Sequence, residues 1–369
     1  MRITFVTPVP IMAGGIRVIA IYAQQLRKRG HEVNVVAPLA SPLSKRARLR
    51  MLLQGRRWPR YEPRPQNHFQ LMGVPVSYLD RPGPVTGADV PDADVVIGCL
   101  WSAANWVSAF GPSKGAKVHF IQGYESHPQG DNAPLEAAWR LPMHKLVISQ
   151  WLADLARERF GDPDVSVVRN SVNTRQFQAP PRAKRPELAV GFVYSDAWSK
   201  AAEVAVEACR LASQRIPALH VRVFGHAPLP AQVKLPANSE YVVNPPQETL
   251  SHLYASCDAW LWSSRQEGFG LPILEAMACR TPVIATRAGA APELLDEGRG
   301  LLVDCDNPEA MAEAIAQVHA LSGPDWKALS DRAYAYVHGY RWEDAAGLFE
   351  RVLERVSAAH RQSRMDGKE

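Results

Sequence analysis

The chain has 369 residues, of which 46% are hydrophobic and 21% are charged. This length and balance are typical of two ordinary globular domains, each with its own core. Residues 1–180 hold 22 lysines and arginines against 13 acids, whereas the remaining residues hold 20 against 24. A basic first half attracts anions such as phosphates or anionic lipid. No uninterrupted run of about 18 apolar residues exists, so no membrane-spanning helix is expected.

The five cysteines are widely spaced and form no Cys-x-x-Cys pair. That pattern fits reduced thiols in a cytoplasmic protein better than a disulfide framework or a zinc site. Residues 3–23 are apolar, but Pro8, Pro10 and Gly14–Gly15 interrupt them. We therefore expect a strand, a loop and a helix there rather than a secretion signal.

Strand and helix signals alternate along the first half, as in a doubly wound parallel sheet. Residues 3–7 form a short apolar run, and apolar residues recur at helical spacing over 16–29. Further buried strands are expected at 33–37, 94–98, 117–122, 145–149 and 165–169, with a helix at 150–160. This half is predicted to be an α/β domain.

The segment 40–66 interrupts that alternation. It contains eight lysines and arginines and a single acid, with leucines between them. Two interpretations stay open: a solvated loop, or a basic amphipathic element that lies on an anionic membrane surface. Nucleic acid is not an expected partner, because only Trp58 and Tyr61 are available to stack on bases.

A second α/β series follows a proline-rich polar stretch at 178–187, which is a candidate linker. Its strands are expected at 188–194, 219–224, 240–244, 258–263 and 281–285, with later helices at 310–321 and 342–359. The predicted organisation is an N-terminal domain 1–177, a second domain 178–340 and a C-terminal segment 341–369. In such sheets ligands bind at the carboxyl ends of strands.

The most informative stretch, Glu267 to Glu275, directly follows one of these strands. Gly268 and Gly270 favour a tight turn, and Pro272 suits the first turn of a helix. The amides of residues 268–271 would then lie at a helix N-terminus, which favours a bound anion. The two glutamates can accept hydrogen bonds from the hydroxyls of a sugar-like ligand.

With the residues that follow it, this stretch resembles glycosyltransferase family 4, the glycogen synthase-like retaining enzymes of the GT-B fold. The residues that carry the resemblance are Glu267–Ala278, Thr281–Ala285, Gly289 and Pro292–Glu293. Family-like segments also occur at Gly14–Gly15, at Val167–Phe177 and at the helix that opens with Trp342. The N-terminal stretches and Phe120–Glu125 are similar to bacterial rhamnosyltransferase-type members.

The resemblance implies two Rossmann-like domains that face each other across a cleft, with a C-terminal helix that crosses back to the first domain. It implies transfer of a sugar from a nucleotide-sugar donor, with retention at the anomeric carbon and no bound cofactor. The acceptor would be a hydroxyl of a glycan, a glycolipid or a small molecule, in bacterial surface polysaccharide synthesis. The expected location is the cytoplasm, with 40–66 on the inner face of the plasma membrane as a further hypothesis.

The resemblance also implies roles for single residues. Glu267 would contact donor-sugar hydroxyls, Glu275 the nucleotide ribose and Lys200 the diphosphate. The remaining predicted binding residues are Gly268, Phe269, Gly270 and Leu271 for sugar and phosphate, Gly225 and Val243 for the base, and Gly14 and Gly15 in the N-terminal glycine loop. A cation and a helix dipole would stabilise the charge that forms when the glycosyl–phosphate bond breaks.

Some positions depart from the family pattern. The arginine that usually follows the strand at 188–194 is absent, and Arg265 or Arg17 are candidate replacements. Ser171 and Asn173 stand where the family often has glycine and aspartate.

A further departure concerns the acceptor base. Gln122 stands where many members have histidine, and glutamine cannot take a proton. Glu125 and His127 are alternative bases, and the leaving phosphate is a third.

Three Asp-x-Asp pairs, starting at Asp92, Asp162 and Asp304, are interpreted as turn and strand-edge acids rather than metal ligands. The predicted reaction is therefore metal-independent. Two other functions stay open: a non-catalytic nucleotide-sugar-binding subunit, and a nucleotide-sugar epimerase on the same fold. Slow donor hydrolysis without an acceptor separates a transferase from a binding subunit. The sequence leaves the oligomeric state open.

Overall fold

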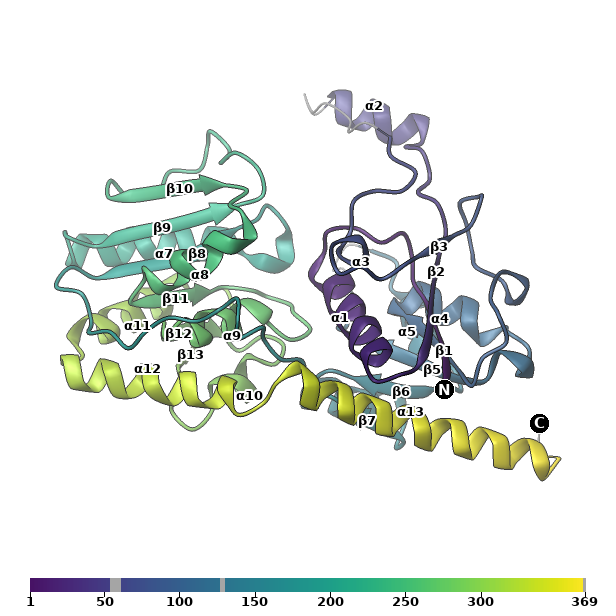
Figure 1. Cartoon of the computed structure of the whole chain (residues 1–369). Helices are drawn as coiled ribbons and strands as arrows, with labels where there is room; N and C mark the ends of the chain where they lie inside the picture. Colours follow the sequence, from purple (N-terminus) through teal and green to yellow (C-terminus); the bar gives the residue numbers. More distant parts are fainter. Residues whose placement is uncertain (54–60, 127–129, 368–369) are drawn as a thin grey trace. The chain divides into compact units, whose positions relative to one another are not determined.

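The computed structural model describes residues 1–53, 61–126 and 130–367. The described chain forms two compact units, each built on its own parallel sheet (Figure 1). The first unit comprises Met1–Ile148, Leu152–Val168 and Ala346–Glu369, and the second comprises Ser149–Trp151 and Arg169–Ala345. The predicted α/β class with two doubly wound sheets is confirmed. The division falls after Val168, before the boundary expected at 177.

In the described residues, the sheet of the first unit has the strand order β3-β2-β1-β4-β5-β6-β7. Its strands are β1 (Arg2–Val6), β2 (Glu32–Ala37), β3 (Ser77–Tyr78), β4 (Val95–Cys99), β5 (Ala116–Ile121), β6 (His144–Val147) and β7 (Val165–Val167). Its helices are α1 (Gly14–Lys28), α2 (Lys45–Leu53), α3 (His68–Leu71), α4 (Leu100–Ser108), α5 (Ala133–Trp139), α6 (Gln150–Phe160) and α13 (Trp342–Met365). Because β1 lies between β2 and β4, the strand order reverses there, and this switch point is where such sheets bind ligands.

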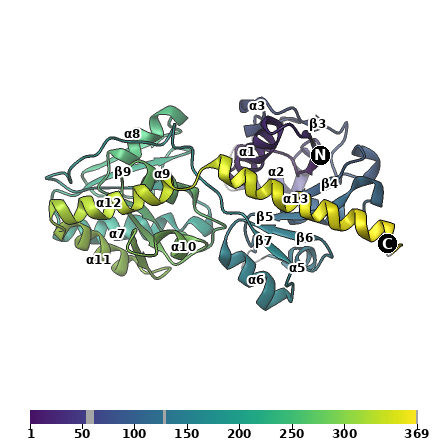
Figure 2. The same cartoon turned by 60° about the horizontal axis from the view of Figure 1, so that its bottom comes forward.

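The C-terminal helix α13 completes the core of the first unit (Figure 2). The ring of Phe349 stacks on Tyr22 of α1, with centroids 4.3 Å apart, and meets the edge of Phe120 at 5.3 Å. Phe349 is fully buried. Residues more than two hundred positions away in the sequence therefore share one aromatic cluster.

In the described residues, the sheet of the second unit has the strand order β10-β9-β8-β11-β12-β13. Its strands are β8 (Ala189–Tyr194), β9 (His220–Gly225), β10 (Ser239–Val243), β11 (Ala259–Trp262), β12 (Val283–Thr286) and β13 (Leu301–Val303). Its helices are α7 (Ala202–Arg215), α8 (Leu250–Ala255), α9 (Leu271–Ala278), α10 (Ala291–Leu295), α11 (Pro308–Ala320) and α12 (Gly323–His338). Here β8 lies between β9 and β11, so the switch point is at the carboxyl ends of β8 and β11.

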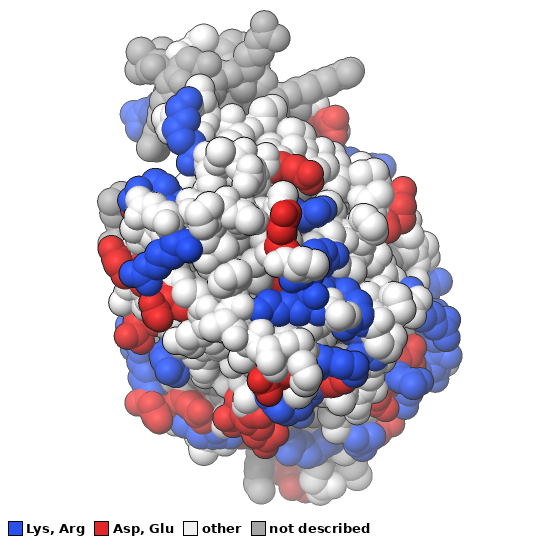
Figure 3. All heavy atoms as spheres, turned by 90° about the vertical axis from the view of Figure 1, so that its left-hand side faces the viewer, with Lys and Arg blue, Asp and Glu red and all other residues white. Residues whose placement is uncertain are grey.

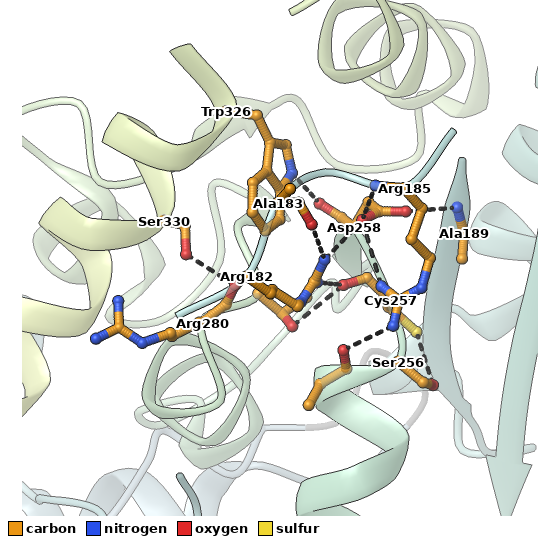
Figure 4. Close-up of polar contacts among 12 residues, drawn as sticks. Arg182, Ala183, Arg185, Ala189, Ser256, Cys257, Asp258, Arg280, Trp326 and Ser330 are labelled. Carbon is orange, nitrogen blue, oxygen red and sulfur yellow. Dashed lines mark hydrogen bonds and ion pairs between the residues drawn. The ribbon is translucent and has the colours of Figure 1, made fainter. Parts of the chain in front are cut away.

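The proline-rich stretch 178–187 is fixed to the second unit by a buried carboxylate (Figure 4). Asp258 Oδ1 accepts hydrogen bonds from Arg182 Nη1 at 2.8 Å and from Arg185 Nη1 at 3.3 Å. The Arg182 guanidinium also lies over the ring of Trp326, 4.5 Å from its centroid. The predicted linker is thus part of the packed second unit.

The second unit carries both signs of charge on its surface. On the face drawn in Figure 3, acidic side chains lie among the basic ones. Exposed ion pairs of this unit include Arg215 with Glu313 at 2.8 Å and Arg210 with Glu207 at 2.6 Å. The basic excess of the protein belongs to the first half of the chain.

Candidate functional site

Lys200 and Glu267 lie on the two sides of the second switch point. Lys200 ends the short turn Trp198–Lys200 after β8, and Glu267 lies in the loop after β11. Since β8 and β11 are neighbours in the sheet, their carboxyl ends bring the two loops together. The Lys200 ammonium forms an ion pair with Glu267 Oε2.

This ion pair is partly open to solvent. The side chain of Lys200 is 38% exposed and that of Glu267 is 20% exposed. Ser263 Oγ donates to the Lys200 carbonyl at 3.0 Å and so ties the two loops together. An exposed pair adds little stability, so its position at the switch point suggests a chemical role.

The loop after Glu267 leads into α9. Gly270 is the N-cap of this helix, with a φ of +102°, and Pro272 lies in the first turn. Within the described residues, no acceptor bonds the N–H groups of Gly268, Phe269, Gly270 and Leu271. Unpaired amides at a helix N-terminus form an anion-binding site.

Further contacts within the second unit hold this loop in place, and one of them comes from Trp151, which lies at the start of α6 but belongs to the second unit. The indole N–H of Trp151 donates to the Gly268 carbonyl at 2.8 Å. Glu293 accepts a hydrogen bond from the Trp151 backbone N–H, also at 2.8 Å. A β-carbon at Gly289 would lie 2.6 Å from the Glu267 carbonyl oxygen, so only glycine fits there. The sequence pattern pointed to Glu293 and Gly289 but missed Trp151.

Glu275 lies in α9 and is 5% exposed. Its Oε2 accepts a hydrogen bond from the hydroxyl of Tyr254 in α8, at 2.8 Å. No spacing in the sequence connects these two residues, so sequence reasoning missed Tyr254. The assignment of Glu275 to a nucleotide ribose stays a prediction.

Arg265 is held by two carboxylates. Its guanidinium pairs with Glu203 and with Asp306, each at 2.5 Å, and donates to the Trp198 carbonyl at 2.8 Å. These contacts fix the turn that carries Lys200. Each of its three nitrogen atoms therefore makes a contact within the protein, and a role for Arg265 in donor binding stays a prediction.

Gly225 and Val243 end the neighbouring strands β9 and β10 and are directly paired. A β-carbon at Gly225 would lie 2.2 Å from the Tyr241 hydroxyl, so a side chain there would displace that hydroxyl. The side chain of Val243 is 48% exposed. The structure thus places both residues on the same carboxyl edge of the sheet as Lys200 and Glu267.

The first unit holds the other predicted residues. Gly14 and Gly15 begin α1, whose N-cap residue makes no side-chain cap. Gln122 directly follows β5, and a β-carbon at Gly15 would lie 3.5 Å from its Oε1. In the described part of the chain, neither the buried Gln122 Nε2 nor the Thr7 hydroxyl after β1 has a hydrogen-bond partner. These polar groups gather near the first switch point.

Leu100, directly after β4, was missed by sequence reasoning. Its φ of +68° is rare for a bulky residue, and such strain clusters at functional sites. Of the alternative bases, Glu125 is exposed, and His127 lies outside the described residues. Arg17 lies in α1, and burial together with the Arg17 charge lowers the pKa of His68 to about 4.

The Asp-x-Asp pairs are engaged with polar or cationic groups of the protein itself. The contacts are Asp92 with Lys114, Asp94 with the Arg2 backbone, Asp162 with Lys145, Asp164 with His144, Asp304 with Arg287 and Asp306 with Arg265. Among the residues that the structure describes, no group of three His, Cys, Asp or Glu side chains is placed to hold a metal ion.

Comparison with known proteins gives matches of two kinds. Residues 187–320 match the family model described as glycosyl transferases group 1. The D-inositol 3-phosphate glycosyltransferase of Corynebacterium urealyticum is 41% identical over 104 residues, 28% of this chain and 24% of that protein. The O-antigen chain mannosyltransferase B of Escherichia coli is 35% identical over 100 residues, 27% of this chain and 26% of that protein. The chain thus spans about a quarter of the length of these relatives.

Solved structures match over nearly the whole chain. The Anabaena protein HepE in complex with UDP has a TM-score of 0.73 at 18% identity, covering 97% of this chain and 100% of that one. The sucrose-phosphate synthase of Thermosynechococcus elongatus has a TM-score of 0.73 at 19% identity, with the same coverage.

These likenesses define the chain as a protein of the GT-B fold. Residues 187–320 match the glycosyl transferases group 1 family, and this match supports the resemblance to glycosyltransferase family 4 over the part of the second unit that carries Lys200 and Glu267. The finer similarity to rhamnosyltransferase-type members stays a prediction.

Proposed function

We propose that this protein is a retaining glycosyltransferase that moves a sugar from a nucleotide-sugar donor to an acceptor hydroxyl. The observation that carries this function is the Lys200–Glu267 pair beside the unpaired amides at the start of α9. A cation and a helix N-terminus suit a diphosphate, and a carboxylate suits sugar hydroxyls. The family match over 187–320 supports the assignment.

In this reaction the bond between the anomeric carbon and the donor phosphate breaks, and its electron pair goes to the phosphate oxygen. Lys200 and the loop amides are placed to stabilise that charge. The acceptor oxygen bonds to the same face of the anomeric carbon, and its proton passes to the leaving phosphate. This route needs no side-chain base at Gln122.

UDP-sugars are the first donors to test. HepE structures contain UDP or UDP-glucose, and a Staphylococcus aureus TarM variant structure contains UDP. A donor that binds only the folded protein raises its melting temperature. A thermal-shift screen of UDP, GDP, dTDP and ADP sugars therefore identifies the nucleotide.

The decisive experiment measures sugar release from the selected donor, with and without acceptor alcohols. Lys200→Ala and Glu267→Ala should each lower turnover by about 100-fold, because leaving-group stabilisation or sugar contact is lost. Lys327→Ala is the control, because Lys327 is another ion-paired surface lysine of this unit. Unchanged turnover in both site variants would overturn the site. Donor binding without turnover in the unmodified protein would favour the non-catalytic subunit.

We propose that the reaction needs no metal ion, because Lys200 and backbone amides stabilise the charge on the leaving phosphate. Turnover should be unchanged, within about 2-fold, after dialysis against EDTA and re-addition of Mg²⁺ or Mn²⁺. A loss of activity that either ion restores would contradict this part.

For the acceptor, we propose a lipid-linked or growing surface polysaccharide. The supporting observation is the local similarity to an O-antigen chain mannosyltransferase. A hydroxyl of a lipid-linked sugar would bring the protein to the cytoplasmic face of a membrane. Among the described residues, no helix is long and apolar enough to cross that membrane.

The basic segment 40–66 supports contact with such a surface. Its described helix α2 exposes Lys45, Arg46 and Arg48, and Leu52 is 57% exposed. Basic and apolar side chains on one short helix suit anionic lipid. Residues 54–60, which include Arg56, Arg57 and Trp58, lie outside the described residues.

Liposome flotation tests this contact. The protein should float with vesicles that contain anionic phospholipid but not with neutral ones, and 1 M salt should release it. Replacing Lys45, Arg46 and Arg48 with glutamine should abolish flotation, whereas replacing Arg210, Arg215 and Lys327 should not. Equal flotation with neutral vesicles would contradict electrostatic binding.

A further inference from the structure

Trp262, the last residue of β11, contacts both parts of the proposed phosphate site. The Lys200 ammonium lies over its ring, 5.2 Å from the centroid. A β-carbon at Gly270 would lie 3.7 Å from Trp262 Cζ2, so the ring also borders the start of α9. Trp262 is 6% exposed, and its carbonyl accepts a hydrogen bond from the Thr286 hydroxyl at 3.3 Å. Trp262 is therefore a buried residue at the carboxyl end of β11.

Hydrogen bonding does not explain why residue 262 is a tryptophan. Within the described residues, the buried Trp262 N–H has no partner. A leucine would fill apolar space there without burying an unpaired donor. What the indole supplies, and leucine does not, is an electron-rich ring face, which attracts a cation within about 6 Å.

The ring and Glu267 also differ in whether they can hold Lys200 throughout the proposed reaction. Lysine carries a compact charge on a flexible stem, so it needs contacts to stay in one place. Glu267 is the ionic contact of Lys200, yet the proposed reaction also directs Glu267 to the donor sugar. The proposed reaction gives the Trp262 ring no second role, so the ring can keep its contact with Lys200 while Glu267 contacts the donor sugar.

We propose that Trp262 is a positioning residue that holds the Lys200 ammonium at the donor diphosphate independently of Glu267. The contact itself is a property of the fold, and only its kinetic consequence rests on the proposed function. Two measurements therefore separate a failure of this contact from a failure of the proposed function.

The first measurement is independent of activity. After reductive [13C]methylation of lysines, the Lys200 signal is assigned as the one absent from Lys200→Arg. A ring face shifts this signal upfield. The shift should persist at reduced size in Trp262→Phe and disappear in Trp262→Leu. Trp326→Leu is the matched control, because Trp326 is a buried tryptophan of the same unit with Arg182, not a lysine, over its ring. An unshifted Lys200 signal in the unmodified protein, or an unchanged one in Trp262→Leu, would overturn the contact.

The second measurement is the kinetics with the donor found by the thermal-shift screen. Trp262→Leu should lower kcat/KM by about 10-fold, and Trp262→Phe should recover it to within about 3-fold. The loss in Trp262→Leu should be larger in a Glu267→Gln background, because the ring is then the remaining contact of Lys200. An equal loss in Trp326→Leu, or no recovery with phenylalanine, would assign the effect to general destabilisation and overturn the positioning role. Absence of turnover in the unmodified protein would refute the proposed function and the kinetic role of Trp262, while the methyl signal still decides the contact.

Discussion

The orientation of Glu275, in the family-like stretch Glu267–Ala278, depends on Tyr254, which lies outside that stretch. A carboxylate that is 5% exposed needs hydrogen-bond donors, because burial removes its water. Tyr254 supplies one donor, and its own ring packs against Trp260 with centroids 4.4 Å apart. The aromatic core therefore fixes the direction of the Glu275 carboxylate.

Tyr254→Phe keeps the ring and removes the hydroxyl. We expect a loss of about 1–2 kcal/mol in the free energy of unfolding and several-fold weaker donor binding, because Glu275 loses a fixed partner. Chemical denaturation and calorimetric titration with the donor measure the two effects. Tyr340→Phe is the control, because it removes the hydroxyl bonded to the Arg169 carbonyl and should leave donor affinity unchanged. Unchanged affinity in Tyr254→Phe would argue against a donor role for Glu275.

Gly270 offers a second test at the level of single residues. Its φ of +102° disfavours any side chain, and an added β-carbon would lie 3.0 Å from Ile273 Cδ1. Gly270→Ala should cost roughly 1–2 kcal/mol of stability and weaken donor binding, since the loop amides shift. Gly161→Ala is the control. Gly161 also has a positive φ, +67°, but an added β-carbon there would meet no atom within 4 Å. This variant should lower the melting temperature without changing donor affinity, and a similar affinity loss in both variants would contradict the anion site.

Among the elements, α13 is fixed to the first unit by charge as well as by Phe349. Glu350 pairs with Arg29 Nη2 at 2.6 Å and with His31 Nε2 at 2.5 Å. Burial raises the pKa of Glu350, but hydrogen bonds from Arg29 and His31 outweigh it and hold the pKa below its usual value. A lowered carboxylate pKa means that ionised Glu350 stabilises the folded state.

Glu350→Gln should lower the free energy of unfolding by roughly 1–2 kcal/mol at neutral pH. The difference from the unmodified protein should be full above the unfolded glutamate pKa of about 4.3 and vanish as the pH falls through the lower folded value. Urea unfolding followed between pH 3 and 7 measures it. Glu354→Gln, an exposed change on the same helix, should have an effect below about 0.5 kcal/mol at every pH. A pH-independent difference would exclude the ionic contact.

Sequence patterns predicted the long buried strands and missed the edge strands β3 and β13 and the helix α12. Strands such as β4 are continuous apolar runs and were expected within a residue of their observed bounds. The strand β3 has two residues and gives no periodic signal. The helix α12 begins at Gly323–Pro324, a pair that usually interrupts a helix. Proline is favoured in the first turn of a helix, however, and Ser322 caps this one, so the same residues also mark a helix start.

The candidate site divides in a similar way. Lys200 and Glu267 were predicted to follow strands, and the sheet order then brings them together. Trp262, Tyr254 and Trp151 contribute through contacts that depend on tertiary packing and leave no spacing in the sequence. Local patterns therefore predicted the parts of the site that lie on strand ends, and not the side chains that position them.

At the scale of the whole molecule, each unit has its own switch point with its own set of polar groups. The second holds the proposed donor residues, and it is also the part that matches the family model. The first holds Gly14–Gly15 and Gln122, and the strained Leu100 follows β4, the strand next to the one that Gln122 follows. We therefore expect changes at Gln122 to alter acceptor use rather than donor binding.

The anchored proline-rich stretch has a consequence for proteolysis. Arg182 and Lys184 would be trypsin sites in a free tether, but Asp258 holds Arg182, and Lys184 donates to the Leu321 carbonyl at 2.7 Å. Trypsin should therefore cut the native protein slowly here and rapidly in Asp258→Asn, which loses the buried charge. The rate of this cleavage, followed by gel electrophoresis, reports how often the stretch 178–187 detaches from the second unit. Equal rates in both proteins would show that Asp258 does not control this release.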